Sequence, residues 1–260
     1  MPHLEDLRLS LSPCELSIKH DKHNMTTPFR CKQFTVHHDQ CAMKIGTDAI
    51  LLGAWAAAVE PQRILDIGTG SGIIALMLAQ RFPAANVTAL EIDAAACDQA
   101  RGNFAASLFC DRLTLTRSAV QDFYPSHNFD LIVCNPPYFD RNSKPSDSAR
   151  TMARHSDSLP LIELAAAASR LMGPGGVLNV ILPIAQALAF ASTATVHDLH
   201  CHCVCAVRPT PTSPPKRQLL GFSNRPPEQD VCAQEIVTEV ARHQYSDDYR
   251  RLAKEFLLRL

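Results

Sequence analysis

The sequence lacks an excess of charge of either sign and lacks a hydrophobic run long enough to cross a bilayer. Its 25 Lys and Arg residues face 26 Asp and Glu residues, giving a formal net charge of -1 at pH 7. This balance excludes strong bulk attraction to nucleic acid, so any RNA contact must come from local patches. The longest apolar run, residues 49–59, is too short for a membrane span. The first residues show no charged start followed by an apolar core, so we expect no secretory signal and a cytoplasmic protein.

What is present is an ordinary globular composition. The chain has 260 residues, of which 46% are hydrophobic and 20% charged. This composition excludes a disordered chain, a collagen and a coiled coil, and the length suffices for one large core. Residues 1–24 show no sustained period and are followed by Met25. We therefore expect residues 1–24 to be a disordered arm or the product of a start codon assigned too early, and residues 25–260 to be the domain.

Cysteines are numerous, at ten, but dispersed. Without an export signal, we expect them to be reduced thiols. The cluster Cys201-His202-Cys203-Val204-Cys205 invites a metal interpretation. However, alternation predicts that its three sulfurs lie on one face of an extended strand, and this spacing suits tetrahedral zinc less well than the usual pairs. We expect a packed strand here and no metal.

Apolar runs alternate with helical segments from residue 63 onward. The expected strands are 63–67, 86–90, 113–116, 129–134 and 176–182, and the expected helices are 72–81, 94–107 and 159–171. Strands that are apolar on both faces indicate a parallel sheet covered by helices on both sides. Segments 197–207 and 218–222, joined by the proline-rich loop 209–216, predict an antiparallel hairpin at the sheet edge. The fold class is therefore α/β, with a seven-stranded, mostly parallel sheet.

A glycine-rich turn, Asp66-Ile-Gly-Thr-Gly-Ser-Gly72, follows the first of these strands. Glycines at alternate positions let the backbone turn tightly and approach a ligand closely. Glu91 stands nineteen residues beyond Gly72, at the end of the next strand, where an acid can accept hydrogen bonds from ribose hydroxyls. A dinucleotide site would place its third small residue at Ile73, and no pyrophosphate clamp is present. An acid before the first glycine is instead typical of S-adenosylmethionine sites. The alternative is a tight turn that binds nothing.

A second motif, Asn135-Pro-Pro-Tyr138, directly follows strand 129–134. In this topology that strand lies beside the glycine-turn strand, so both motifs face one crevice. Asn135 and the carbonyl of Pro136 can accept the two hydrogens of a planar amino group, and the prolines fix the backbone. Tyr138 would stack on the group that carries the nitrogen. The pattern predicts methyl transfer to an amino nitrogen, achieved by positioning without a strong base.

With these motifs, the sequence resembles the Rossmann-like methyltransferases of the Asn-Pro-Pro-Tyr type. It is more closely similar to the bacterial valine-tRNA adenine-37 N(6)-methyltransferases. The segments that carry this resemblance are 29–34, 43–55, 66–72, 135–138, 153–154, 245–249 and 256–258. The block at 43–55 is the specific part, because the two motifs are shared with many relatives.

The resemblance implies a role for particular residues. Those expected to bind the cofactor S-adenosylmethionine are Lys44, Gly46, Thr47, Asp66, Gly68, Gly70, Glu91, Ala119 and Asn135, with Asp48 packed nearby. Those expected on the substrate side are Gln33, Phe34, Pro137, Tyr138 and Arg154, and the catalytic group is Asn135, Pro136 and Tyr138. The family usually has an Asp where this chain has Ala119. A backbone amide or Asp122 could replace that contact.

The resemblance also implies a tRNA partner, and no DNA or membrane partner is expected. A local basic rim would be formed by Arg30, Lys32, Arg141, Lys144, Arg150 and Arg154, with Lys216 and Arg217 as further candidates. The alternative is that these are ordinary scattered surface charges.

Two other functions use the same motifs. A methyltransferase acting on a glutamine side-chain amide needs the same chemistry, but those enzymes usually carry a separate helical amino-terminal domain, whereas this chain has the block from Lys32 to Trp55. An inactive cofactor-binding RNA-binding protein need not keep Asn135 and Tyr138 intact. Methylation of a tRNA adenine is therefore the leading hypothesis.

Overall fold

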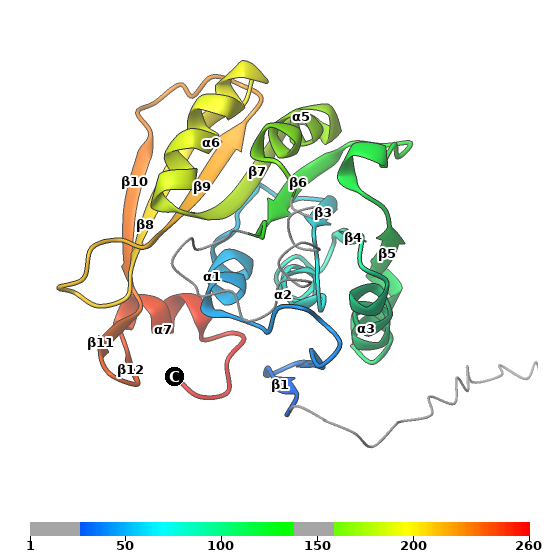
Figure 1. The fold of residues 1–260 in the computed structure, drawn as a ribbon, viewed down its shortest axis with the longest axis vertical. Helices are drawn as coiled ribbons and strands as arrows, with labels where there is room; N and C mark the ends of the chain where they lie inside the picture. Colours follow the sequence, from blue (N-terminus) through cyan, green and yellow to red (C-terminus); the bar gives the residue numbers. More distant parts are fainter. Residues whose placement is uncertain (1–26, 138–158) are drawn as a thin grey trace, which may run out of the picture.

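The structure, a computed structural model, describes residues 27–137 and 159–260. Its centre is an eight-stranded sheet with the order β10-β8-β9-β7-β6-β3-β4-β5 (Figure 1). These strands are β3 (Arg63–Ile67), β4 (Asn86–Glu91), β5 (Leu113–Arg117), β6 (Phe129–Cys134), β7 (Met172–Pro183), β8 (His200–Arg208), β9 (Arg217–Ser223) and β10 (Cys232–Val237). Within this sheet β9 runs antiparallel to both of its neighbours, and the other pairs are parallel.

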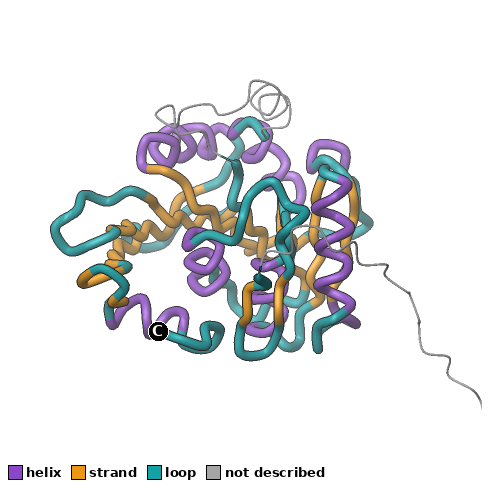
Figure 2. The backbone as a smooth tube through the Cα atoms, turned by 60° about the horizontal axis from the view of Figure 1, so that its bottom comes forward, coloured by secondary structure: helices purple, strands orange, loops and turns teal. Residues whose placement is uncertain are grey.

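Helices cover both faces of the sheet (Figure 2). They are α1 (Thr47–Trp55), α2 (Ile73–Arg81), α3 (Ala94–Ala105), α5 (Leu161–Leu171), α6 (Ile184–Val196) and α7 (Asp247–Ala253), with short 3-10 turns η1 (Cys110–Arg112) and η2 (Val120–Asp122). Side chains of α1, α2, α3 and α7 join one buried cluster, and those of α5 and α6 join the other. The sheet is therefore apolar on both sides, as its sequence pattern indicates.

The prediction of an α/β fold with a mostly parallel sheet is confirmed. The prediction of seven strands with the hairpin at the edge needs correction, because β10 adds an eighth strand that pairs with β8 and becomes the edge. Most of β10 is exposed, so it carries no apolar pattern by which to recognise it. The expected helices also do not include α6.

The cysteine-rich strand β8 departs from simple alternation. Its pairing with β9 shifts register between Cys201 and Cys203. As a result Cys201 packs towards the α5 and α6 side, whereas Cys205 joins the cluster on the α1 and α2 side. The expectation of three sulfurs on one face is corrected, because a β-bulge interrupts the two-residue period. Within residues 27–137 and 159–260, no group of three or more His, Cys, Asp or Glu side chains is arranged to hold a metal ion.

Segments from the two ends of the domain pack together. The hairpin of β1 (Phe29–Arg30) and β2 (Thr35–Val36) meets the C-terminal residues through a bridge between Cys31 and Leu257. The N–H of Lys32 donates to the carbonyl of Phe256 at 2.8 Å. The small hairpin of β11 (Glu239–Ala241) and β12 (Gln244–Tyr245) precedes α7, whose N-cap is Ser246. None of the helices in the described ranges is long and apolar enough to cross a membrane. The arm at 1–24 lies outside the described residues.

Candidate active site

The glycine-rich turn connects β3 to α2 at the carboxyl end of the sheet. Gly68, Gly70 and Gly72 all have positive φ, at 71°, 54° and 85°. Residues with a Cβ are disfavoured in this region, so the glycines are needed for the backbone path itself. At Gly72 a Cβ would also lie 2.4 Å from Cε1 of Phe104. This left-handed residue is the N-cap of α2, so the helix begins at Ile73 rather than at residue 72.

Asp66 lies near the end of β3 with a fully buried carboxylate. Its Oδ2 accepts the Thr69 hydroxyl at 2.6 Å and the Ala75 N–H at 3.1 Å, so it caps the first turn of α2. Its Oδ1 is buried and has no hydrogen-bond partner. Burial, with a smaller contribution from the charge of Glu91, raises the pKa of Asp66 to about 7 against the opposing effect of these two hydrogen bonds. The site therefore holds an acceptor oxygen that a cationic or hydrogen-bonding ligand would satisfy.

Glu91 ties the end of β4 to the same turn. Its Oε2 accepts the Gly70 N–H at 2.8 Å, and its Oε1 accepts the N–H groups of Ile92 at 2.8 Å and Asp93 at 3.0 Å. These bonds use three of the about four acceptor positions of a carboxylate, so about one position remains for a further donor such as a ribose hydroxyl. The apolar side chain of Ile92 is 43% exposed next to this carboxylate.

Asn135 follows β6, the strand beside β3. In their parallel pairing Cys134 is opposite Ile67, so Asn135 and Gly68 extend from adjacent strand ends. The Oδ1 of Asn135 is buried and accepts no hydrogen bond. Ile67 pairs with Leu90 on one side and with Cys134 on the other, so Asp66 and Glu91 lie at the same strand ends as Cys134. Burial, followed by the charges of these two carboxylates, raises the pKa of the Cys134 thiol. The carboxyl edge of the sheet thus brings together the glycine turn, two carboxylates and an unpartnered amide oxygen.

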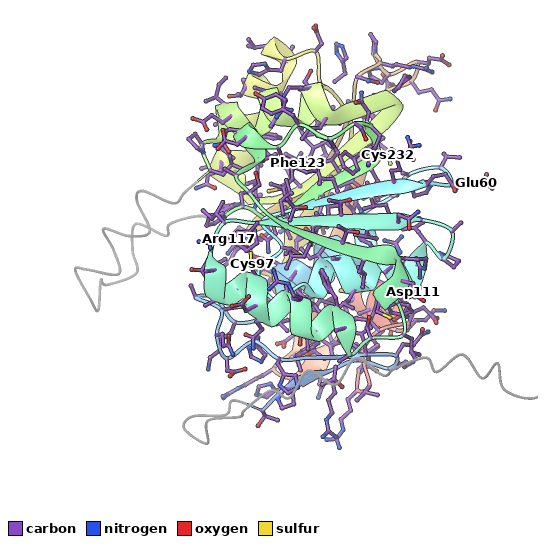
Figure 3. All side chains as sticks on the ribbon, turned by 90° about the vertical axis from the view of Figure 1, so that its right-hand side faces the viewer. Glu60, Cys97, Asp111, Arg117, Phe123 and Cys232 are labelled. Carbon is purple, nitrogen blue, oxygen red and sulfur yellow. The ribbon has the colours of Figure 1, made fainter. Side chains whose placement is uncertain are left out.

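This edge can be followed in Figure 3, where Arg117 lies at the carboxyl end of its strand, beside Cys97 of α3, and Asp111 and Glu60 lie at the opposite end. The Arg117 Nε donates to the carbonyl of Ile92 at 3.2 Å. The Ser118 N–H donates to the carbonyl of Glu91, the last residue of β4, at 3.0 Å. Ala119 therefore directly follows a residue that is bonded to the end of β4. Ala119 is the N-cap of η2, which ends at Asp122.

The upstream residues divide between surface and core. Lys44, Gly46 and Thr47 are exposed around the start of α1, with Gly46 as its N-cap. Gln33 is exposed as well. Phe34, in contrast, is only 6% exposed and packs edge-on against Phe109 at 6.2 Å between ring centroids. This ring is enclosed in the hydrophobic core, and its expected place on the substrate side stays a prediction.

Several of the expected residues lie outside the described ranges, namely Tyr138, Arg141, Lys144, Arg150 and Arg154. Of the motif residues that are described, Pro136 is buried and Pro137 is exposed. Arg30, Lys32 and Lys216 are exposed, and the Lys32 ammonium donates to the Lys254 carbonyl at 2.6 Å.

Sequence reasoning missed two buried polar residues on α3. Gln99 is 7% exposed and Asn103 is 2% exposed, and both contact the segment before α1. Their spacing of four residues puts them on one helix face. Amides at that spacing, among the small residues of 94–105, are a signal that the sequence does contain.

The residues present fit S-adenosylmethionine. The ligand offers an ammonium group and ribose hydroxyls, and the edge offers the unpartnered oxygen of Asp66 and the remaining acceptor position of Glu91. A family model called Methyltransferase small domain matches residues 41–182. The fold and the site together define an S-adenosylmethionine-dependent methyltransferase.

The curated relatives narrow this class. The chain is 46% identical over 233 residues to the tRNA1(Val) (adenine(37)-N6)-methyltransferase of Phocaeicola vulgatus, covering 89% of this chain and 98% of the relative. It is 43% identical to the protein of the same name from Bacteroides thetaiotaomicron, covering 91% and 100%. Among solved structures, one described as a predicted O-methyltransferase from Agrobacterium tumefaciens superposes with a TM-score of 0.62 at 19% identity, covering 80% of this chain and 96% of that one, which supports the fold. At this similarity the chain belongs to the tRNA1(Val) (adenine(37)-N6)-methyltransferase family.

Proposed function

We propose that this protein transfers a methyl group from S-adenosylmethionine to the exocyclic N6 nitrogen of adenine-37 in valine tRNA. The observation that carries the proposal is the buried, unpartnered Oδ1 of Asn135 beside the glycine turn on adjacent strand ends. Membership of the family supports the choice of tRNA and of base.

The cofactor would be held mainly by the turn and the two carboxylates. Asp66 would receive the methionine part, and Glu91 the ribose hydroxyls. Lys44, Gly46, Thr47 and Ala119 are proposed from the family resemblance to complete its surroundings. When bound, S-adenosylmethionine supplies an electrophilic methyl group on a sulfonium centre.

Asn135 and Pro136 would activate and orient the acceptor. The nitrogen of an aromatic amine is a poor nucleophile because its lone pair is delocalised into the ring. The Asn135 side-chain oxygen and the Pro136 carbonyl would accept its two N–H groups, draw it towards tetrahedral geometry and localise the lone pair. The fixed φ of proline keeps this carbonyl in place. Because the nitrogen loses its proton only as it becomes cationic, no strong base is required.

Substrate binding would use exposed residues. Gln33 and Pro137 are exposed and support this part of the proposal, together with Tyr138 and Arg154 from the resemblance. An adenine in a folded tRNA must leave its stack to reach Asn135. The tRNA backbone would meet a local basic rim that includes Arg30 and Lys32. We propose a cytoplasmic enzyme, acting where tRNA is present.

The test supplies the protein with labelled S-adenosylmethionine and either unmodified total tRNA or a peptide-chain release factor. We expect label in tRNA, and N6-methyladenosine at position 37 when digested valine tRNA is analysed by mass spectrometry. Label in the release factor alone would replace this function with glutamine-amide methylation. Cofactor binding without transfer to either acceptor would indicate an inactive binding protein.

A further inference from the structure

Helix α3 carries two buried amides on the face that backs the glycine turn. Gln99 and Asn103 are 7% and 2% exposed, in a helix whose other buried residues are Ala96, Cys97, Ala100 and Phe104. A buried amide without partners is costly, so its hydrogen bonds indicate what it holds in place. Both amides bond to residues about sixty positions earlier in the chain.

Asn103 joins two separate segments. Its Oδ1 accepts the N–H of His37 at 2.9 Å, and its Nδ2 donates to the carbonyl of His37 at 2.8 Å. The same Nδ2 donates to the carbonyl of Ser71 at 2.8 Å. Ser71 lies between Gly70 and Gly72 of the glycine turn, so the Asn103 side chain connects residue 37 to this turn.

Gln99 continues this attachment one helical turn earlier. Its Oε1 accepts the N–H of Gln40 at 2.8 Å and the thiol of Cys41 at 3.5 Å. Its Nε2 donates to Oδ1 of Asp39 at 2.8 Å. Asn103 therefore binds the start of segment 37–41 and Gln99 binds its end. Of the two amides, Asn103 is the one that also bonds to the glycine turn.

The segment held in this way borders the proposed cofactor site. The next residue on α3, Phe104, is so close to Gly72 that a Cβ there would lie 2.4 Å from its ring. At the other end, the charges of Glu91 and Asp93 reach Cys41 and, after burial itself, raise the pKa of its thiol to about 12. Residue 41 is bonded to Gln99 of α3, and the N-cap of this helix, Asp93, follows the carboxylate proposed to bind ribose by two residues. Lys44, Gly46 and Thr47 follow shortly after residue 41 in the chain.

We propose that Gln99 and Asn103 are positioning residues, which hold residues 37–41 against the glycine turn and so fix the upstream wall of the cofactor site. This inference rests on the proposed function for the identity of the ligand. It adds to that function two residues that touch neither substrate nor cofactor and act through the segment they hold.

The first test reverses the donor and the acceptor of the hydrogen bond between Gln99 and Asp39. In Gln99→Glu the new carboxylate still accepts the Gln40 N–H but faces the Asp39 carboxylate, so the segment should be displaced. We expect the Kd of S-adenosylmethionine, measured by calorimetry, to rise about tenfold, or 1.4 kcal/mol. Adding Asp39→Asn should bring the Kd back to within about threefold of the parent protein, about 0.7 kcal/mol, because the new amide can donate to the new carboxylate.

The added charge of Gln99→Glu by itself would lower the Kd instead of raising it. The cofactor is a cation, so a negative charge added near the site without displacement would tighten binding. Asp39→Asn alone is the matched control, since its amide oxygen can still accept from Gln99, and its Kd should stay within about twofold of the parent value, about 0.4 kcal/mol. We also expect the KM for cofactor to rise in Gln99→Glu while kcat at saturating cofactor changes little. An unchanged Kd in Gln99→Glu, or failure of the double variant to recover with a parent-like melting temperature, would overturn the proposal.

The second test needs no activity. In Asn103→Asp the carboxylate faces the carbonyls of His37 and Ser71, so hydrogen exchange at residues 37–41 of the cofactor-free protein should accelerate at least about tenfold. Strand β5 should keep its parental exchange and so reports that the fold is intact. Parental exchange at 37–41 would contradict the inference. If instead the parent protein fails to bind S-adenosylmethionine, the proposed function fails, while the exchange result still decides whether these amides hold the segment.

Discussion

The Nε of Arg217 lies 2.9 Å from Oδ2 of Asp48, which joins the first turn of α1 to the start of β9. The side chains are 29% and 20% exposed, so the pair is partly shielded from solvent. We expect Asp48→Asn and Arg217→Gln each to lower the free energy of unfolding. A double-mutant cycle in urea should give a coupling of about 1 kcal/mol, between the values for exposed and buried pairs.

A more exposed ion pair on α3 offers a comparison for this coupling. Arg101 and Asp98 also form an ion pair, but their side chains are 61% and 72% exposed. The same cycle on this pair should give no more than about 0.5 kcal/mol. Equal coupling energies for the two pairs would show that the partial burial of Asp48 and Arg217 does not strengthen their contribution to stability.

The second prediction concerns Asn135. Its buried oxygen is proposed to bind the acceptor amine, so Asn135→Ala should lower kcat at least about 100-fold, as loss of one preorganised polar group does in other enzymes. Cofactor binding by calorimetry should stay within about tenfold, or 1.4 kcal/mol. Asn128, at the other end of the same strand, donates to the Met172 carbonyl at 3.2 Å and supplies the matched variant. We expect Asn128→Ala to keep near-parental turnover, and near-normal turnover in Asn135→Ala would contradict the mechanism.

The third prediction follows from the pKa of Asp66. Burial raises that pKa from 3.8 to about 7 in the folded, cofactor-free protein. The folded state therefore binds more protons than the unfolded state between these values, and the free energy of unfolding should fall as pH rises from about 4 to 7. In Asp66→Asn the amide oxygen can still accept from Thr69 and Ala75, so the fold should survive.

We expect Asp66→Asn to remove this part of the pH dependence. Urea unfolding from pH 4 to 8 should show the variant gaining stability relative to the parent by a few kcal/mol, because each tenfold difference in proton affinity between the folded and unfolded states corresponds to about 1.4 kcal/mol. Cofactor affinity should fall at the same time, because the carboxylate loses its charge and one of its acceptor oxygens. Parallel stability curves for the two proteins would show that the carboxyl group does not titrate in this range.

The fourth prediction compares two glycines. Gly72 has a φ of 85° and its Cβ would lie 2.4 Å from Phe104, whereas a Cβ at Gly102 in α3 would meet nothing within 4 Å. Gly72→Ala should therefore lower the free energy of unfolding by about 3 kcal/mol, through backbone strain and the clash. Gly102→Ala should raise it by about 0.5–1 kcal/mol, because alanine favours the helix. Similar effects at both positions in urea unfolding would contradict this account.

Elements whose cause is local can be predicted from the order of amino acids. Gly68, Gly70 and Gly72 mark a turn because positive φ is a property of the single residue. The apolar runs at 63–67 and 129–134 indicate buried parallel strands, and the rule that such strands end at one edge brings Asp66 and Asn135 together. The same reasoning does not reach β10, whose exposed residues carry no pattern, or the bulge at Cys201, which interrupts one.

The packing of the whole chain establishes which distant segments touch. It places Phe34 against Phe109, pairs Asp48 with Arg217, and sets residues 37–41 against Gln99 and Asn103. The physical reason is that a side chain's hydrophobicity and hydrogen-bonding capacity are fixed by its chemistry, whereas its partner is fixed by how helices and strands pack across the whole chain. The sequence therefore indicates which side chains require burial or a hydrogen-bond partner, and the packing of the whole chain determines which residue provides it.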